Sequence, residues 1–284
     1  MFSTNYYCLV AGLREYTLDG DTKGFDPEAI TAEILGDVSK ADARQVRLLK
    51  GYFDCENIAA LRAGRQACNP LGNFTREELE DEMKSPRRLE APIARVIKAF
   101  RDAENEEEPT ETIDDKTSFE AQLFGAYYEL CRQKGCRFLK AWAEFDRTLR
   151  NVSAAVTARA INRPIDSVTV GGGYVVELLK RSQAADFSLR GELPYIDAVI
   201  AAVNDEENLV EKEHKIDLIR WNEAQTLSTF DYFDINAILA YLVRVHIVAR
   251  WTQLDPKRGR EMLDRLMAEL DGRAAIDRQR SEQE

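Results

Sequence analysis

The sequence predicts an all-α protein, and three observations lead to this expectation. Apolar residues recur at steps of three and four in most segments, the spacing that places them on one face of a helix. Many of these segments begin at a capping residue or a proline and stop at a glycine or proline. A Phe-Asp pair followed by an asparagine occurs three times along the chain. We therefore expect a single domain over residues 1–284, built from three diverged copies of one helical unit.

The first helical unit is expected over residues 1–85, and its helices are marked by capping signals. A side-chain oxygen just before a helix can accept a hydrogen bond from a free amide of the first turn. Proline is well tolerated at the first helical position, and a Ser or Thr with an acidic residue three positions later resembles a capping box. The three signals are Asp26-Pro27, Ser39 with Asp42, and Thr75 with Glu78.

A charged connection is expected over residues 86–117. It is interrupted by Pro86, Pro92 and Pro109 and carries an acidic run over residues 104–108. Within this connection we expect one helix, over about residues 91–103. The remainder is typical of a solvated and mobile segment.

The second unit is expected over residues 118–190. Ser118 should cap a helix that stops at Gly135. A longer helix should follow and end before Pro164, because one apolar stripe continues at helical spacing through Phe138, Trp142, Phe145, Leu149, Val152 and Val156.

The third unit is expected over residues 191–272 and contains the most apolar segment of the chain. A helix opened by Leu193-Pro194 and a charged helix over 206–225 should precede a helix over 235–251. Asp255-Pro256 should cap a last helix to about residue 270, and residues 273–284 should form a flexible tail.

The helix over 235–251 should be buried, because its strongly polar residues are few: Asn236, Arg244, His246 and Arg250. These residues also argue against a membrane span. His246 is expected to be a core histidine with satisfied hydrogen bonds. Arg244 and Arg250 should meet carboxylates or helix carbonyls, or face a partner, since an unpaired buried arginine is costly.

The three Phe-Asp motifs supply the other candidate residues. The simplest interpretation is that their polar residues start helices, each contributing roughly 1 kcal/mol. The alternative is a surface that contacts a partner, and chance recurrence of the motif also stays open. The residues concerned are Asp54, Asn57, Asp146, Asn151, Asp234 and Asn236.

The sequence offers little that points to catalysis or to a cofactor. Glu211 and His214 have the spacing of a di-iron helix motif, but a second such motif is absent and a solvated helix face is the simpler interpretation. Gly171-Gly172-Gly173 lacks the Lys-Ser/Thr of a phosphate-binding loop and is typical of a flexible turn. We expect no catalytic residue, no metal and no cofactor.

Composition indicates the cellular setting. Lys and Arg number 39 against 50 Asp and Glu, a difference of 39 − 50 = −11, so a nucleic-acid partner is not expected. The first thirteen residues lack the basic lead and long apolar core of a secretion signal, which favours the cytoplasm. Five cysteines without a C-x-x-C pair should be reduced and mostly buried.

Several segments resemble a rotary ATPase component. The segment 54–63, D-C-E-N-I-A-A-L-R-A, resembles a signature of the C subunit of V/A-type ATPases, which is named d in eukaryotes. The segments 5–13, N-Y-Y-C-L-V-A-G-L, and 232–243, Y-F-D-I-N-A-I-L-A-Y-L-V, with Arg250-Trp251 beyond, are more similar to an uncharacterised bacterial family encoded among V-type ATPase subunits.

This resemblance implies three pseudo-symmetric helical units arranged as a funnel. It also implies a non-catalytic adaptor on the cytoplasmic face of the membrane, between the membrane rotor ring and the central shaft. The motif residues could then line the funnel and touch the shaft. A helical scaffold unrelated to the rotor is the alternative, and a metal-dependent helical enzyme is a third hypothesis.

Overall fold

The structure is a computed structural model that describes residues 4–20, 22–104, 117–204 and 208–253. Within these ranges the chain forms α-helices, one short 3-10 helix and no strand, which confirms the all-α prediction. The predicted last helix to residue 270, the tail over 273–284 and the acidic run over 105–116 lie outside the described residues. None of the described helices is long and apolar enough to cross a membrane.

Twelve elements follow one another in the described part of the chain. Those in the N-terminal half are α1 (Tyr7–Gly12), α2 (Pro27–Asp37), α3 (Lys40–Arg62), α4 (Arg76–Lys84), α5 (Ala91–Glu104) and α6 (Phe119–Lys134). Those in the C-terminal half are α7 (Arg137–Ala160), η1 (Ile165–Ser167), α8 (Tyr174–Arg181), α9 (Ile196–Asn204), α10 (Leu209–Leu227) and α11 (Ile235–Gln253).

Most predicted helix starts are found where the capping signals place them. Asp26 accepts hydrogen bonds from the first amides of α2, and Ser118 accepts one from the first turn of α6. Thr75 and Glu78 form the complete capping box of α4. Ser39 caps α3, but its own N–H donates to the Tyr6 hydroxyl instead of to the Asp42 carboxylate. The expected box at α3 is therefore only half formed.

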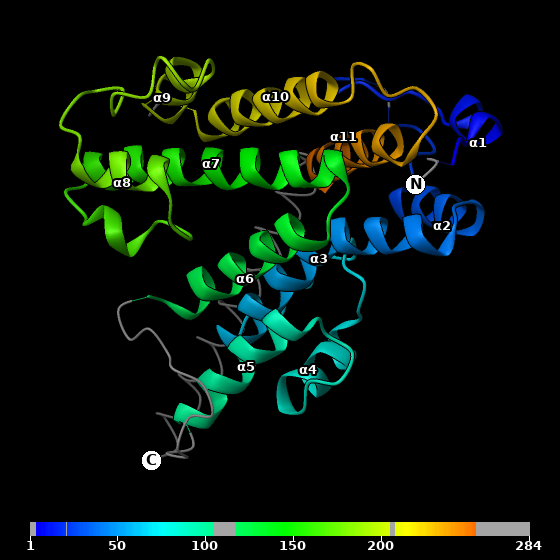
Figure 1. The fold of residues 1–284 in the computed structure, drawn as a ribbon, viewed down its shortest axis with the longest axis horizontal. Helices are drawn as coiled ribbons and strands as arrows, with labels where there is room; N and C mark the ends of the chain where they lie inside the picture. Colours follow the sequence, from blue (N-terminus) through cyan, green and yellow to red (C-terminus); the bar gives the residue numbers. More distant parts are fainter. Residues whose placement is uncertain (1–3, 21, 105–116, 205–207, 254–284) are drawn as a thin grey trace, which may run out of the picture.

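The long helices pack around one hydrophobic core. In Figure 1, α7 crosses the molecule, with α10 and α11 on one side and α6, α5 and α4 on the other. Helix α6 packs between α5, α7 and α3, and α11 contacts α2, α3, α7 and α10. The predicted apolar stripe of α7 is buried from Phe138 to Val156.

Helix α11 is buried around most of its circumference, as predicted. Only Asn236, Ala237, Arg244 and Arg250 are half-exposed over residues 235–250. Its central position follows from its composition, because a helix that is apolar on every side can be shielded from water only between other helices. In this way α11 joins the N-terminal helices to α7 and α10.

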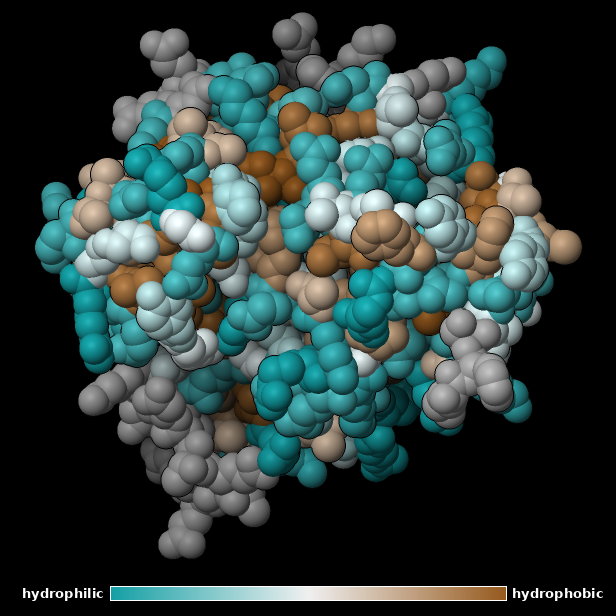
Figure 2. Space-filling model, turned by 45° about the horizontal axis from the view of Figure 1, so that its top comes forward, coloured by the Kyte–Doolittle hydropathy of each residue, from teal (hydrophilic) through white to brown (hydrophobic). Residues whose placement is uncertain are grey.

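The molecular surface is mixed in character. On the face drawn in Figure 2, hydrophobic residues reach the surface in several separate places, with hydrophilic residues between them. All five cysteines are free; Cys55 and Cys131 are buried, while Cys8 is exposed and the other two are half-buried. The expectation of mostly buried thiols is therefore only partly met.

Candidate functional site

The first Phe-Asp motif holds a loop against α3. Asp54 and Asn57 are buried in the interior of this continuous helix. Asn57 Nδ2 donates to the carbonyl of Asn69 at 2.9 Å, and Asn57 Oδ1 accepts from the N–H of Asn69 at 2.6 Å. Asp54 Oδ1 accepts from the N–H of Asn73 at 2.6 Å. The prediction that these residues start a helix is wrong, because their side chains lie inside α3 and satisfy backbone groups of a half-buried loop.

The loop over 69–73 approaches α3 so closely that it requires a glycine. A Cβ atom on Gly72 would lie 2.7 Å from Asp54 Oδ1 and 3.2 Å from Asn57 Nδ2. Both distances are shorter than an ordinary contact to carbon allows. The absence of a side chain at Gly72 therefore lets both polar groups reach the loop backbone.

The second motif repeats this arrangement in α7. Asn151 lies in the helix interior, donates from Nδ2 to the Val170 carbonyl at 3.0 Å and accepts from the Val170 N–H at 2.8 Å. Like Asn57, it pairs with both backbone groups of a single loop residue. Asp146, also inside α7, instead accepts from the Tyr128 hydroxyl and pairs with Arg220. The expected helix start is again wrong, because α7 begins nine residues before Asp146, at Arg137.

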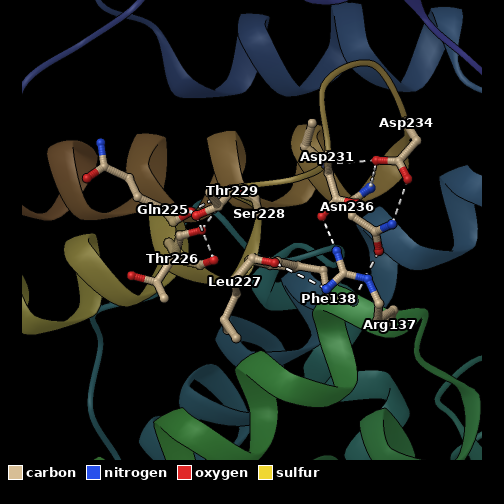
Figure 3. A network of polar contacts seen from close by, with 12 residues as sticks. Arg137, Phe138, Gln225, Thr226, Leu227, Ser228, Thr229, Asp231, Asp234 and Asn236 are labelled. Carbon is tan, nitrogen blue, oxygen red and sulfur yellow. Dashed lines mark hydrogen bonds and ion pairs between the residues drawn. The ribbon is translucent and has the colours of Figure 1, made fainter. Parts of the chain in front are cut away.

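The third motif does start a helix. Asp234 Oδ1 accepts from the N–H groups of Asn236 and Ala237 at the beginning of α11, which confirms its predicted capping role. Figure 3 shows Asn236 reaching across to α7, where Oδ1 accepts from the N–H of Phe138 at 3.0 Å. Helix α7 has no side-chain cap from its own Cys136. Asn236 thus satisfies a free amide of a helix 98 residues away in sequence.

A cavity of about 360 Å³ lies between five helices. Its wall combines aromatic, acidic and basic side chains from α3, α6, α7, α10 and α11, with Asn69 and Leu71 from the loop that α3 holds. The lining residues of this central cavity are Leu49, Tyr52, Phe53, Glu56, Asn69, Leu71, Tyr127, Tyr128, Trp142, Ala143, Asp146, Glu213, Asp217, Arg220, Val243, His246, Ile247 and Arg250.

A network of ion pairs forms one side of the central cavity. Arg220 Nε lies 3.1 Å from Asp146 Oδ1, and Arg220 Nη1 lies 3.0 Å from Asp217 Oδ1. Arg250 Nη1 lies 2.7 Å from Asp217 Oδ2, and Arg250 also pairs with Glu213. Burial alone would lower the pKa of Arg220, but the charges of Asp146 and Asp217 outweigh it and raise that pKa. Burial likewise opposes the charge of Arg250, but Asp217 and Glu213 raise its pKa, so both guanidinium groups stay charged.

The two arginines of α11 differ in their surroundings. Arg250 meets carboxylates, as predicted. Arg244 packs over the rings of Trp221 and Tyr241, and its Nε is buried without a hydrogen-bond partner. Desolvation lowers the pKa of Arg244. The expectation of a carboxylate or carbonyl partner is not met at this Nε, because aromatic faces surround the guanidinium instead.

Two polar groups of the central cavity have no ion pair with any described residue. Within the described ranges the Glu56 side chain accepts one hydrogen bond, from the Asn69 amide at 3.3 Å, and burial raises the pKa of its carboxyl group. His246 is 8% exposed, and its Nε2 has no hydrogen-bond partner. Burial, with a smaller effect of the Lys50 charge, lowers the pKa of His246 to about 3. The prediction of a satisfied core histidine is wrong, because Nε2 is buried among described residues that offer it no hydrogen-bond partner.

The remaining candidates do not come together as a reactive site. His214 Nε2 pairs with Asp19 Oδ1 at 2.8 Å, and its ring lies against Trp251. Across the described ranges, no cluster of three or more His, Cys, Asp or Glu side chains has the arrangement of a metal site. Gly171 and Gly173 both have positive φ in the turn before α8, where Arg147 donates to the Gly172 carbonyl.

Sequence reasoning missed the centre of the site. Helix α10, which has the pattern of a charged and solvated helix, carries three of its residues: Glu213, Asp217 and Arg220. A fourth, Glu56, lies within the first Phe-Asp motif, where only Asp54 and Asn57 were candidates. One signal was present: Asp217 is four residues before Trp221, so an acidic and a large apolar side chain share one face of α10. Both are buried.

Fold and site together define an all-α protein whose longest helices surround a charged central cavity. The chain belongs to the family described as "Protein of unknown function (DUF2764)", whose model matches residues 3–271. It is similar to an uncharacterized protein of Chlamydia pneumoniae, with 22% identity over 235 residues, which covers 81% of this chain and 85% of the relative. No solved structure matches the chain.

Proposed function

We propose that this protein is a non-catalytic adaptor of a V/A-type rotary ATPase that links the membrane rotor ring to the central shaft. The observation that carries the proposal is the repeated use of a buried asparagine in a long helix. Asn57 in α3 and Asn151 in α7 each pair with both backbone groups of one residue in a following loop. Such recurrence supports diverged copies of one unit, as in the rotary-ATPase adaptors that the sequence resembles.

In this proposal the three units cover residues 1–85, 118–190 and 191–272, and each contributes one long helix to the centre. The three helices are α3, α7 and α11, and α11 contacts both of the others. An adaptor that transmits torque must keep its shape under load. Close packing of the long helices and buried hydrogen bonds to their loops would supply that rigidity.

Exposed aromatic residues supply a surface for the partner proteins. Phe230 is 87% exposed and Tyr232 is 67% exposed in the loop before α11, and Tyr7 of α1 packs against Phe233 beside them. We call these four residues the aromatic edge. Exposed aromatic side chains are enriched at protein interfaces, because each buries a large area at low entropic cost. In the proposed complex they would bind a rotor component at the inner face of the membrane.

The test is co-purification of the full chain with the shaft and ring proteins of a V/A-type ATPase encoded in the same genome. We expect a stable complex with at least one of them. The double variant Phe230→Ser/Tyr232→Ser should weaken binding about tenfold or more. The control is Ile161→Ser/Tyr174→Ser, which removes two side chains that are 65% and 62% exposed elsewhere on the surface.

The control double variant should bind like the unmodified protein. If the unmodified protein binds neither the shaft nor the ring, the adaptor proposal is wrong and a helical scaffold with another partner becomes the better hypothesis. If both double variants bind equally well, the adaptor role stands and the aromatic edge is not its contact surface.

A further inference from the structure

We propose that the central cavity binds a small organic cation, with a primary ammonium or guanidinium group on a short apolar body. This inference does not depend on the adaptor role, because it rests on the chemistry of the cavity wall alone. A volume of about 360 Å³ falls within the range of small-molecule sites. Glu56, Glu213 and Arg250 are half-exposed, so the cavity reaches the surface on their side.

The charge of the wall favours a cation. Four carboxylates, those of Glu56, Asp146, Glu213 and Asp217, line the cavity against the two guanidinium groups of Arg220 and Arg250, an excess of 4 − 2 = 2 negative charges. Each guanidinium is already paired with two carboxylates. An anionic ligand would have to break these pairs, whereas a cation would leave them in place.

One carboxylate of the wall remains for a ligand. Among the described residues, the Glu56 side chain accepts one hydrogen bond, from the neutral amide of Asn69, and forms no ion pair. His246 is neutral at pH 7, since burial holds its pKa at about 3. A neutral imidazole adds no positive charge to the wall. The Glu56 carboxylate therefore offers a site for N–H donors, as ammonium and guanidinium groups provide.

Aromatic rings form much of the remaining wall. Tyr52, Phe53, Tyr127, Tyr128 and Trp142 line the cavity, and the Phe53 ring meets the His246 ring edge to face at 5.0 Å. The faces of such rings attract cations, and the effect is stronger where water is excluded. They also shield an apolar body from water. The combination is suited to an alkylammonium or alkylguanidinium ion, and an uncharged alcohol of the same length would bind more weakly.

Calorimetric titration of the full chain tests this inference. The probes are n-butylamine and n-butylguanidine, both cationic at pH 7, and n-butanol as the uncharged control of similar size. We expect at least one cation to bind about tenfold or more tightly than n-butanol. Equal binding of all three compounds, or no binding of either cation, would overturn the proposal.

Three variants locate the bound cation. Glu56→Gln removes the carboxylate with little change of shape and should weaken cation binding about tenfold or more. Ala143→Leu adds side-chain atoms at the cavity wall and should weaken binding of every probe. The control is Glu223→Gln, because Glu223 is another half-buried glutamate whose pKa is raised by burial, yet it lies outside the cavity.

The control variant should bind like the unmodified protein. Circular dichroism of each variant shows whether it is folded, so that a loss of binding is not mistaken for unfolding. If Glu56→Gln alters the fold, Ala143→Leu still decides the outcome. Cation binding that survives Ala143→Leu unchanged would place the ligand elsewhere and overturn the proposal.

Discussion

The side-chain amide of Asn151 takes the place of a backbone hydrogen-bond partner. Its oxygen and nitrogen pair with the N–H and C=O of Val170, two groups that are buried and have no helix of their own to join. Asn57 does the same for Asn69. Removing such an amide leaves a donor and an acceptor unpaired away from water. The cost of that loss is greater than the modest net value of the hydrogen bonds themselves.

Asn151→Ala should lower the free energy of unfolding by roughly 2–4 kcal/mol, because two backbone groups lose their partners and a small cavity is created. Urea denaturation followed by circular dichroism measures this change. The matched control is Asn222→Ala in α10, where the asparagine is exposed and the change should stay within about 0.5 kcal/mol. Equal effects of the two substitutions would show that the Val170 contacts contribute nothing.

Burial of His246 makes the free energy of unfolding depend on pH. Its folded pKa of about 3 lies below the ordinary value of 6.5, so the unfolded chain binds more protons between these limits. The stabilising contribution of the neutral imidazole is therefore complete above pH 6.5 and is lost as the pH falls toward 3. Asp54 and Glu56 act in the opposite sense, since burial raises their pKa values.

His246→Leu should reduce the slope of unfolding free energy against pH over the acidic range, by as much as about 1.4 kcal/mol per pH unit for one proton. Urea denaturation at a series of pH values measures both slopes. The carboxyl groups of Asp54 and Glu56 remain in both proteins, so the difference between the slopes isolates the imidazole. Parallel curves for the two proteins would mean that His246 keeps an ordinary pKa in the folded state.

Helices α7, α10 and α11 are joined by charge as well as by apolar packing. Arg220 of α10 binds Asp146 of α7, and Asp217 of α10 binds Arg250 of α11. Trp251 Nε1 also donates to Asp217, at 2.9 Å, and the Tyr128 hydroxyl donates to Asp146, at 2.7 Å. Each buried carboxylate of the network has a guanidinium partner, so loss of one arginine would leave Asp146 or Asp217 to bear the cost of desolvation.

Arg220→Met should lower the free energy of unfolding by about 3–5 kcal/mol, because the buried carboxylates of Asp146 and Asp217 lose a countercharge. The double variant Arg220→Met/Asp146→Asn should recover part of this loss, and a double-mutant cycle measures the coupling. The control Arg190→Met breaks the exposed pair with Asp197 and should change the free energy of unfolding far less, because water screens that pair. Additive effects of the first two substitutions would contradict a coupled network.

Local chemistry explains why helices were easier to predict than the site. Caps such as Asp26 and Ser118 act within one turn, and the stripe of α7 is a property of one segment, so both could be derived from the sequence. The partners of Asn57, Asn151 and Asn236 lie 12, 19 and 98 residues away. No local pattern distinguishes such an asparagine from a cap, and for this reason the expected helix starts at two of the three motifs are wrong.

The cavity could not be predicted from local sequence patterns either. Its wall draws on five helices, and its charged residues are ordinary surface types when each helix is considered alone. The need of Arg250 for carboxylate partners could be predicted, because it sits on a helix that is apolar around most of its circumference. Its partners Asp217 and Glu213 could not, because choosing them requires knowing that α10 lies along α11.

The described part of the molecule has one continuous core, although we propose three units of common ancestry. A single cluster of buried apolar residues extends from Tyr6 to Val248 and includes residues of α3, α6, α7, α9, α10 and α11. Helix α11 contacts elements from the beginning, middle and end of the described chain. Units that share their core should not unfold separately, since each would expose apolar surface on its neighbours.

We therefore predict one cooperative unfolding transition for the full chain. The three tryptophans, Trp142, Trp221 and Trp251, report on α7, α10 and α11, whereas far-ultraviolet circular dichroism reports on every helix. Urea transitions followed by the two signals should coincide in midpoint and slope, because the helices of the first unit lose their packing when α11 does. A circular dichroism transition that begins or ends apart from the fluorescence transition would show that the N-terminal helices form a separate folding unit. In that case the contacts of α11 with α2 and α3 would be too weak to carry load between them, which would also weaken the case for a torque-transmitting adaptor.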